Sequence, residues 1–149
     1  MGIKRILKKE EKTFSRILEP IIEEFKLRDI VQVIIGASIL SIPVGFTEET
    51  WRLGKQLPML NILMLMLISF VFLATFLAYH HYHVHIQEFW YDYALRLIAT
   101  YVISFIVVAV LLSTINVTNW LTDFVLAFKT TIIVTFPACM SAAVADTLK

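Results

Sequence analysis

The sequence predicts an all-α membrane protein with four transmembrane helices preceded by an N-terminal amphipathic helix. Hydrophobic residues make up 58% of the 149 residues and charged residues only 17%, whereas about a quarter of an ordinary soluble domain is charged. Four long apolar stretches follow one another along the chain, and a helix needs about 20 such residues to cross a bilayer. The segment before them is strongly charged, which sets it apart from the crossings.

Residues 1–29 are predicted to form a cytoplasmic, basic, amphipathic helix. Apolar residues recur from Ile3 to Phe25 at spacings of three, four and seven, which places them on one helix face. Lysine and arginine crowd the first half of this segment, and such charge marks the cytoplasmic side of a membrane. The helix either docks on anionic lipid headgroups or only supplies the charge that sets orientation. Four crossings then place both termini in the cytoplasm of a multi-pass protein of the cell membrane.

The transmembrane domain is expected to occupy residues 30–149, with crossings at about 30–51, 57–79, 92–115 and 121–145. Asp29 is a candidate cap for the first crossing. In the third, Asp92 is expected to pair with Arg96 one turn later. Prolines inside two of the crossings predict helix kinks, at Pro43 and Pro137.

Small residues recur on one face of the fourth crossing at spacings of three and four. Small side chains let neighbouring helix backbones approach closely in lipid. This face is therefore expected to pack against another helix; it comprises Thr131, Thr135, Ala138, Ser141 or Ala142, and Ala145.

One face of the first crossing is small, polar and acidic at its end. If the helix continues past Pro43, the residues of this face share roughly a third of the circumference; they are Ser38, Ser41, Gly45, Glu48, Glu49 and Arg52. Such a face calls for a contact other than lipid, which could be a second helix, a partner subunit or a water-filled path. The two glutamates would then lie at the mouth of an ion path, or they are solvated acids of a turn.

Lys129 lies within the fourth crossing, six positions after Asp123. A cation that deep in hydrocarbon costs a few kcal/mol unless it is paired or reaches the surface. We therefore predict an ion pair of Lys129 with Glu49, between helices or between subunits. The alternative is that the lysine side chain extends to the outer surface of the membrane.

All four histidines lie close together, at positions 80, 81, 83 and 85. His81 and His85 are one helical turn apart, so the cluster could hold a transition metal with His83 and with Glu88 from the next turn. It could also respond to cytoplasmic pH, or form an interfacial belt without a ligand. A single histidine cluster, with no Ser-His-Asp set and no phosphate-binding glycine loop, argues against an enzyme, and no cofactor is expected.

The order of features resembles a family of prokaryotic integral membrane proteins of unknown function. In that family a first crossing with a proline is followed by Thr-x-Glu-x-Trp and a Leu-Gly pair, which correspond to Pro43, Thr47, Glu49, Trp51, Leu53 and Gly54. Its last crossing carries an acidic start, a mid-span lysine and a Pro-Ala pair followed by small residues, which correspond to Asp123, Lys129, Pro137, Ala138, Ser141 and Ala142. The resemblance implies an integral membrane protein and no particular activity.

These features predict a small homo-oligomeric channel or transporter for cations or protons. One chain of this size has little interior for a path, so the path is expected between protomers. The expected partners are the lipid bilayer, other copies of the chain and a small cation or proton; the net charge of +1 gives no attraction to nucleic acid. The first alternative is a non-conducting assembly or sensor protein. A metal-binding membrane protein that uses the histidine cluster is the second alternative.

Overall fold

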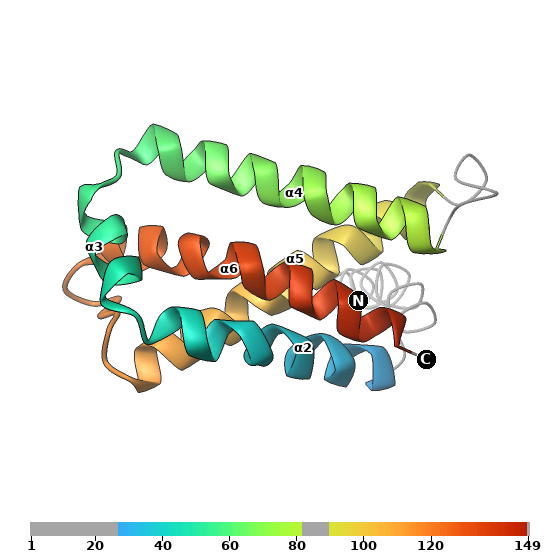
Figure 1. Cartoon of the computed structure of the whole chain (residues 1–149), viewed down its shortest axis with the longest axis horizontal. Helices are drawn as coiled ribbons and strands as arrows, with labels where there is room; N and C mark the ends of the chain where they lie inside the picture. Colours follow the sequence, from blue (N-terminus) through green and yellow to red (C-terminus); the bar gives the residue numbers. More distant parts are fainter. Residues whose placement is uncertain (1–26, 82–89, 149) are drawn as a thin grey trace, which may run out of the picture.

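The computed structural model describes residues 27–81 and 90–148. These residues form helices joined by short connections, without a strand among them. The helices are α2 (Leu27–Gly45), α3 (Glu48–Gln56), α4 (Met59–His81), α5 (Trp90–Thr114) and α6 (Phe124–Thr147) (Figure 1). The predicted amphipathic helix lies almost wholly outside the described residues.

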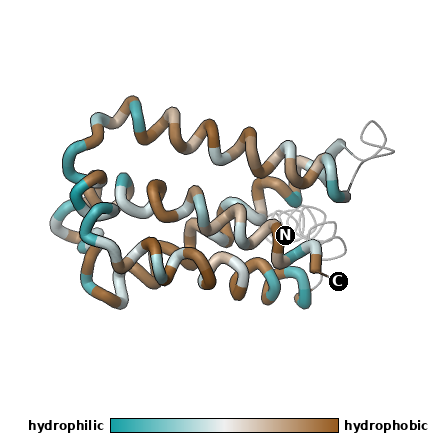
Figure 2. The backbone as a smooth tube through the Cα atoms, viewed as in Figure 1, coloured by the Kyte–Doolittle hydropathy of each residue, from teal (hydrophilic) through white to brown (hydrophobic). Residues whose placement is uncertain are grey.

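The four expected crossings are confirmed as helices. α2, α4, α5 and α6 are each long and apolar enough to span a membrane. Figure 2 shows that the hydrophilic positions gather toward the two ends of the bundle, while hydrophobic positions dominate the long helices between them. The all-helical fold class with four candidate membrane crossings is therefore established for the part of the chain that the structure describes.

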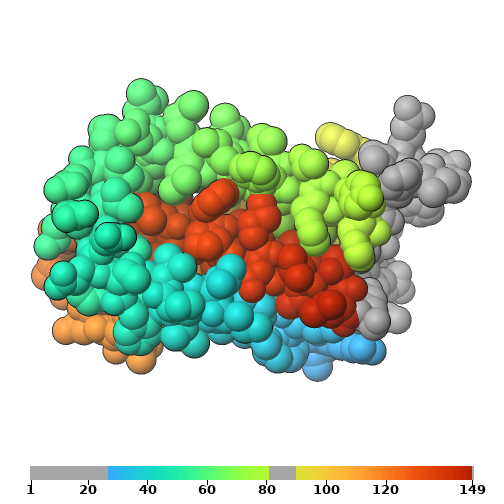
Figure 3. All heavy atoms as spheres, viewed as in Figure 1, coloured from blue at the N-terminus to red at the C-terminus, as the bar shows by residue number. Residues whose placement is uncertain are grey.

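α6 is the helix around which the others are arranged. It contacts α2, α3, α4 and α5, and in Figure 1 it runs between α2 and α4. In Figure 3 the side chains of α4, α6 and α2 follow one another across the visible face. α6 therefore holds together helices that are far apart in the sequence.

The bundle has two ends that differ in content. The start of α2, the end of α6 and both sides of the α4–α5 connection lie at one end, which we call the terminal end (Figure 1). The other end, the α3 end, carries α3 and the turn at residues 115–123. This arrangement agrees with the predicted up-and-down order of the crossings.

The predicted small-residue face of α6 is confirmed as a helix contact. Ala138 and Ala142 are buried in one core cluster with Val33 and Ala37 of α2. At Gly36 an added Cβ atom would lie 2.6 Å from Ala145 Cβ and 2.8 Å from the Ala142 Cα atom. The two backbones therefore approach so closely that a side chain at position 36 has no room.

The first crossing ends earlier than the sequence suggested, because α2 stops at Gly45 and α3 starts separately at Glu48. The last carbonyls of a helix lack intrahelical partners, and here side chains from the following residues supply them. Thr47 Oγ1 and Thr50 Oγ1 donate to the Val44 carbonyl at 2.8 and 2.9 Å. Trp51 Nε1 donates to the Gly45 carbonyl at 2.8 Å. These bonds fix the bend between α2 and α3.

Candidate functional site

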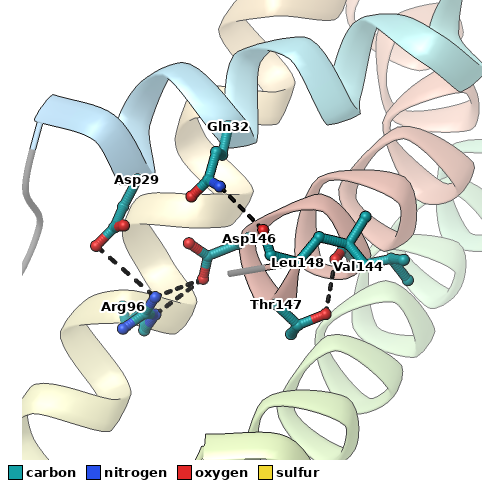
Figure 4. A network of polar contacts seen from close by, with 7 residues as sticks. All are labelled: Asp29, Gln32, Arg96, Val144, Asp146, Thr147 and Leu148. Atoms are coloured by element: carbon teal, nitrogen blue, oxygen red, sulfur yellow. Dashed lines mark hydrogen bonds and ion pairs between the residues drawn. The ribbon is translucent and has the colours of Figure 1, made fainter.

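Three charged side chains from three candidate membrane helices meet at the terminal end of the bundle (Figure 4). Arg96 of α5 donates from Nε and Nη2 to Asp146 Oδ2 of α6, at 3.1 and 2.5 Å. Asp29 of α2 lies on the other side of the guanidinium, with Oδ2 4.0 Å from Nη2. We call these three residues the buried charge cluster.

The buried charge cluster is closed off from solvent. The exposed fractions are 5% for Asp29, 6% for Arg96 and 0% for Asp146. Removing charges from water costs several kcal/mol per ion even after relaxation, and the cost is recovered only through good pairing. Because charged residues inside membrane segments are rare and usually functional, this cluster is the first candidate for a site.

Two oxygen atoms beside the cluster are buried and accept no hydrogen bond from the described residues. They are Asp146 Oδ1 and Gln32 Oε1. The amide nitrogen of Gln32 donates to the Leu148 carbonyl at 3.3 Å, just beyond the end of α6. In the view of Figure 4 both unpartnered oxygens point into the space between α2 and α6. The site thus presents acceptors that a proton donor or a cation would satisfy.

The predicted partner of Arg96 was wrong. The sequence pairs Arg96 with Asp92 of the same helix, but the structure pairs it with Asp146 and Asp29 of other helices. Asp29 lies within the first turn of α2, with its side chain buried near Arg96 rather than in a cap position. Arg96 itself begins a buried line along α5 that continues through Thr100, Ser104 and Val108. This line faces the other helices, so the guanidinium is turned inward.

Sequence reasoning did not identify Asp146, although a signal was present. It follows Ala138 and Ala142 at spacings of four, so it extends the small-residue face by one more turn. A carboxylate on a face that packs against another helix requires a cation nearby. α6 continues to Thr147, so this extra turn is still helical.

The predicted polar face of the first crossing is divided between two environments. Ser41 is 3% exposed and Gly45 is buried beside Leu112 of α5. Ser38 is half-buried and donates to the Ile34 carbonyl at 2.8 Å. The acids Glu48 and Glu49 are exposed in the first turn of α3. Within one chain, therefore, no single open surface joins these residues.

The two exposed glutamates border a depression at the α3 end. It measures about 450 Å³ and is lined by Glu48, Glu49, Trp51, Arg52 and Lys55. The first turn of a helix carries the positive end of its dipole, so two acids are favourable there. Neither carboxylate forms an ion pair or a hydrogen bond with the described residues. Both remain available to a solute or to a neighbouring chain.

Lys129 is half-buried in α6 and reaches the end of α3. Its Nζ atom donates to the Leu57 carbonyl at 2.9 Å. A cation at the last carbonyls of a helix is favourable because the dipole is negative there. Glu49 and Lys129 form no ion pair within the described part of one chain. A pair between subunits stays a prediction.

That prediction can be tested by exchanging the charges. If Glu49 and Lys129 of neighbouring protomers pair, Glu49→Lys and Lys129→Glu should each weaken assembly, and the double exchange should restore it. The measurement is the oligomer fraction of the detergent-solubilised protein by size-exclusion chromatography with light scattering. Glu48→Lys, with Lys129→Glu, is the matched control and should not restore assembly. A double exchange as damaged as the single variants would contradict the pair.

The proposed metal site cannot be assembled from the described residues. His83, His85 and Glu88 lie outside them, and His81 is the last residue of α4. Within residues 27–81 and 90–148, no group of three or more potential ligands is close enough to hold a metal. His80 stacks on Phe76, with ring centroids 6.0 Å apart. The histidine metal site therefore stays a prediction.

The two prolines for which kinks were predicted both lie inside helices, Pro43 in α2 and Pro137 in α6.

A family comparison covers all of the described helices. The family described as "Putative integral membrane protein (DUF2391)" matches residues 10–148. The chain belongs to this family. Every described helix falls within the match, so membership agrees with the four candidate membrane crossings. No curated protein and no solved structure matches the chain. The family description names a membrane protein and no activity, so an activity must be argued from the geometry.

Proposed function

We propose that the chain is a small homo-oligomeric transport protein of the membrane for cations or protons. The observation that carries this proposal is the buried charge cluster of Asp29, Arg96 and Asp146. A buried ion pair contributes little net stability compared with apolar residues of the same volume. Charged side chains inside apolar helices are instead typical of ion and proton pathways. The cluster is therefore proposed as the internal binding site.

The acids at the α3 end support the same function. Glu48 and Glu49 are exposed beside a depression at the opposite end from the cluster. Carboxylates at a membrane surface raise the local concentration of cations. The proposed route therefore runs between Glu49 at the α3 end and Asp146 at the terminal end.

The proposal needs more than one copy of the chain. Thr131, Thr135, Ala138 and Ala142 of α6 are buried, and Ser41 and Gly45 of α2 are packed as well. These contacts fill the middle of the single chain, so the middle of the route is proposed between protomers, beside α2. At the terminal end the route enters the chain to reach Asp146. Oligomers of small membrane proteins are usually symmetric, and their shared axis offers such a route.

A second candidate function rests on the same packing. Because Ser41 and Gly45 lie against protein within one chain, the polar face of α2 has a structural use that requires no water. A non-conducting assembly or sensor protein would need only this arrangement. Aqueous thiol reagents distinguish the two candidates at Ser38→Cys, which reacts in the transport protein and is protected in the assembly protein.

The direct test is ion flux into liposomes that contain the purified protein. Wild-type protein is expected to carry protons or a monovalent cation, and Asp146→Asn is expected to reduce the initial rate at least tenfold. Glu49→Gln is expected to reduce it less, because that acid only concentrates the ion. The control is Asp123→Asn, an exposed acid outside both proposed sites. Absence of flux above empty liposomes for wild type would overturn the proposal.

A further inference from the structure

The way Arg96 holds Asp146 leaves one carboxylate oxygen unused. In a bidentate arginine–carboxylate pair, each of two N–H groups contacts a different oxygen. Here Nε and Nη2 both donate to Oδ2, while Oδ1 is buried without a hydrogen-bond donor among the described residues. Arg96 thus fixes the carboxylate through one atom and leaves the other atom for a different interaction.

Gln32 presents a second acceptor whose orientation is fixed. Its Nε2 atom donates to the Leu148 carbonyl, which can only accept a hydrogen bond. In this orientation the amide oxygen is the atom on the other side, and it is also buried without a donor among the described residues. Both oxygens point into the same space between α2 and α6 (Figure 4), and two buried acceptors without a donor cost free energy.

We propose that Asp146 binds a proton on Oδ1 and then donates a hydrogen bond to Gln32 Oε1, while Arg96 keeps donating to Oδ2. The proton comes from water, forms one O–H bond on the carboxyl group and returns to water when it leaves; no other bond changes. This inference rests on the proposed transport function, and it names the proton as the transported species.

The surroundings of Asp146 allow both forms. Arg96 of α5 and Asp29 of α2 are the charged side chains that face the site among the described residues. α4, which also packs against α6, brings Tyr79 and His80 to the same end of the bundle. When Asp146 becomes neutral, the guanidinium still has Asp29 at 4.0 Å. Proton uptake therefore leaves a charge-balanced Arg96–Asp29 pair instead of an isolated buried cation.

The closing experiment is infrared difference spectroscopy of the full chain in lipid vesicles, comparing acidic with alkaline buffer at constant sodium concentration. We expect the carbonyl stretching band of a neutral carboxylic acid, which disappears in Asp146→Asn. In Gln32→Leu, which keeps Asp146 and Arg96, the band should remain and shift to higher frequency, because the hydrogen bond to the amide is lost. Asp123→Asn is the control for exposed acids and should leave this band unchanged.

Three outcomes overturn the inference. The first is a carboxylic acid band that persists unchanged in Asp146→Asn. The second is a band that keeps its frequency in Gln32→Leu. This second variant retains Asp146, so it tests the inference even if Asp146→Asn does not fold. The third is a carboxylate band of Asp146 that responds to sodium at constant pH and not to pH, which would assign the site to a metal cation. If the band behaves as expected but the liposomes show no ion flux, the proton site on Asp146 stands and the proposed transport function is overturned. If the protein carries sodium but the band is absent, the transport function stands and the proton site is overturned.

Discussion

Asp146→Ala is expected to lower the free energy of unfolding by about 3–5 kcal/mol, because it leaves Arg96 buried with a weakened set of partners. Asp146 accepts both of the short donations from the guanidinium, and Asp29 is 4.0 Å away from Nη2. The measurement is unfolding in mixed micelles, followed by circular dichroism as the denaturing detergent is increased. Asp123→Ala removes an exposed acid and should leave the transition nearly unchanged.

A replacement of the whole buried charge cluster separates stability from function. Arg96→Met combined with Asp146→Leu and Asp29→Asn removes all three charges, and exchanges of buried ion pairs for uncharged residues of similar volume are often neutral or stabilising. The triple variant is expected to unfold within about 2 kcal/mol of wild type and to carry no protons. If it were as unstable as Asp146→Ala, the cluster would be required for folding and its presence would no longer argue for transport.

Gly36→Leu is the second change with a large expected effect. The nearest atoms to an added Cβ are Ala145 Cβ at 2.6 Å, and Ala142 Cα and the Ser141 carbonyl oxygen at 2.8 Å. Two of these atoms belong to the backbone of α6, so the helices have to separate. Overpacking of this kind costs about 1–3 kcal/mol, and more where the backbone must move. The midpoint of thermal unfolding in detergent is therefore expected to fall by several degrees.

Gly45→Ala is the matched control for this prediction. At position 45 an added Cβ would meet only side-chain methyl groups, Leu112 Cδ2 at 3.1 Å and Val134 Cγ1 at 4.0 Å. The Leu112 side chain would have to shift by only a few tenths of an ångström, and no backbone atom of a neighbouring helix has to move. This variant is therefore expected to lose much less stability than Gly36→Leu. An equal loss at both positions would mean that close approach of α2 to α6 is not what Gly36 provides.

Most of the fold could be predicted because crossing a membrane depends on composition. Long apolar runs identify the crossings, and the small residues of α6 identify a contact face. The end of the first crossing could not be predicted in the same way. Thr47 has extended backbone angles, with φ −87° and ψ 135°, and the bend depends on side chains that reach back to carbonyls of Val44 and Gly45. Hydropathy contains no information on such hydrogen bonds.

The candidate site was harder to predict because its members are distant in the sequence. Arg96 and Asp146 are separated by 50 positions, and pairing rules for one helix favoured Asp92 instead. Only the packing of three helices decides which acid the guanidinium meets. Lys129 illustrates the same point, since its partner is a backbone carbonyl at Leu57 that has no sequence signature.

The central position of α6 has a consequence for biosynthesis. α2, α4 and α5 leave the ribosome before α6 and enter the bilayer without the helix that they later surround. Until α6 arrives, Arg96 lacks the Asp146 carboxylate, to which its Nε and Nη2 atoms donate in the assembled bundle. Final assembly therefore has to follow translation of α6, and a ribosome stalled before Phe124 would leave a membrane-inserted intermediate that quality-control proteases can recognise.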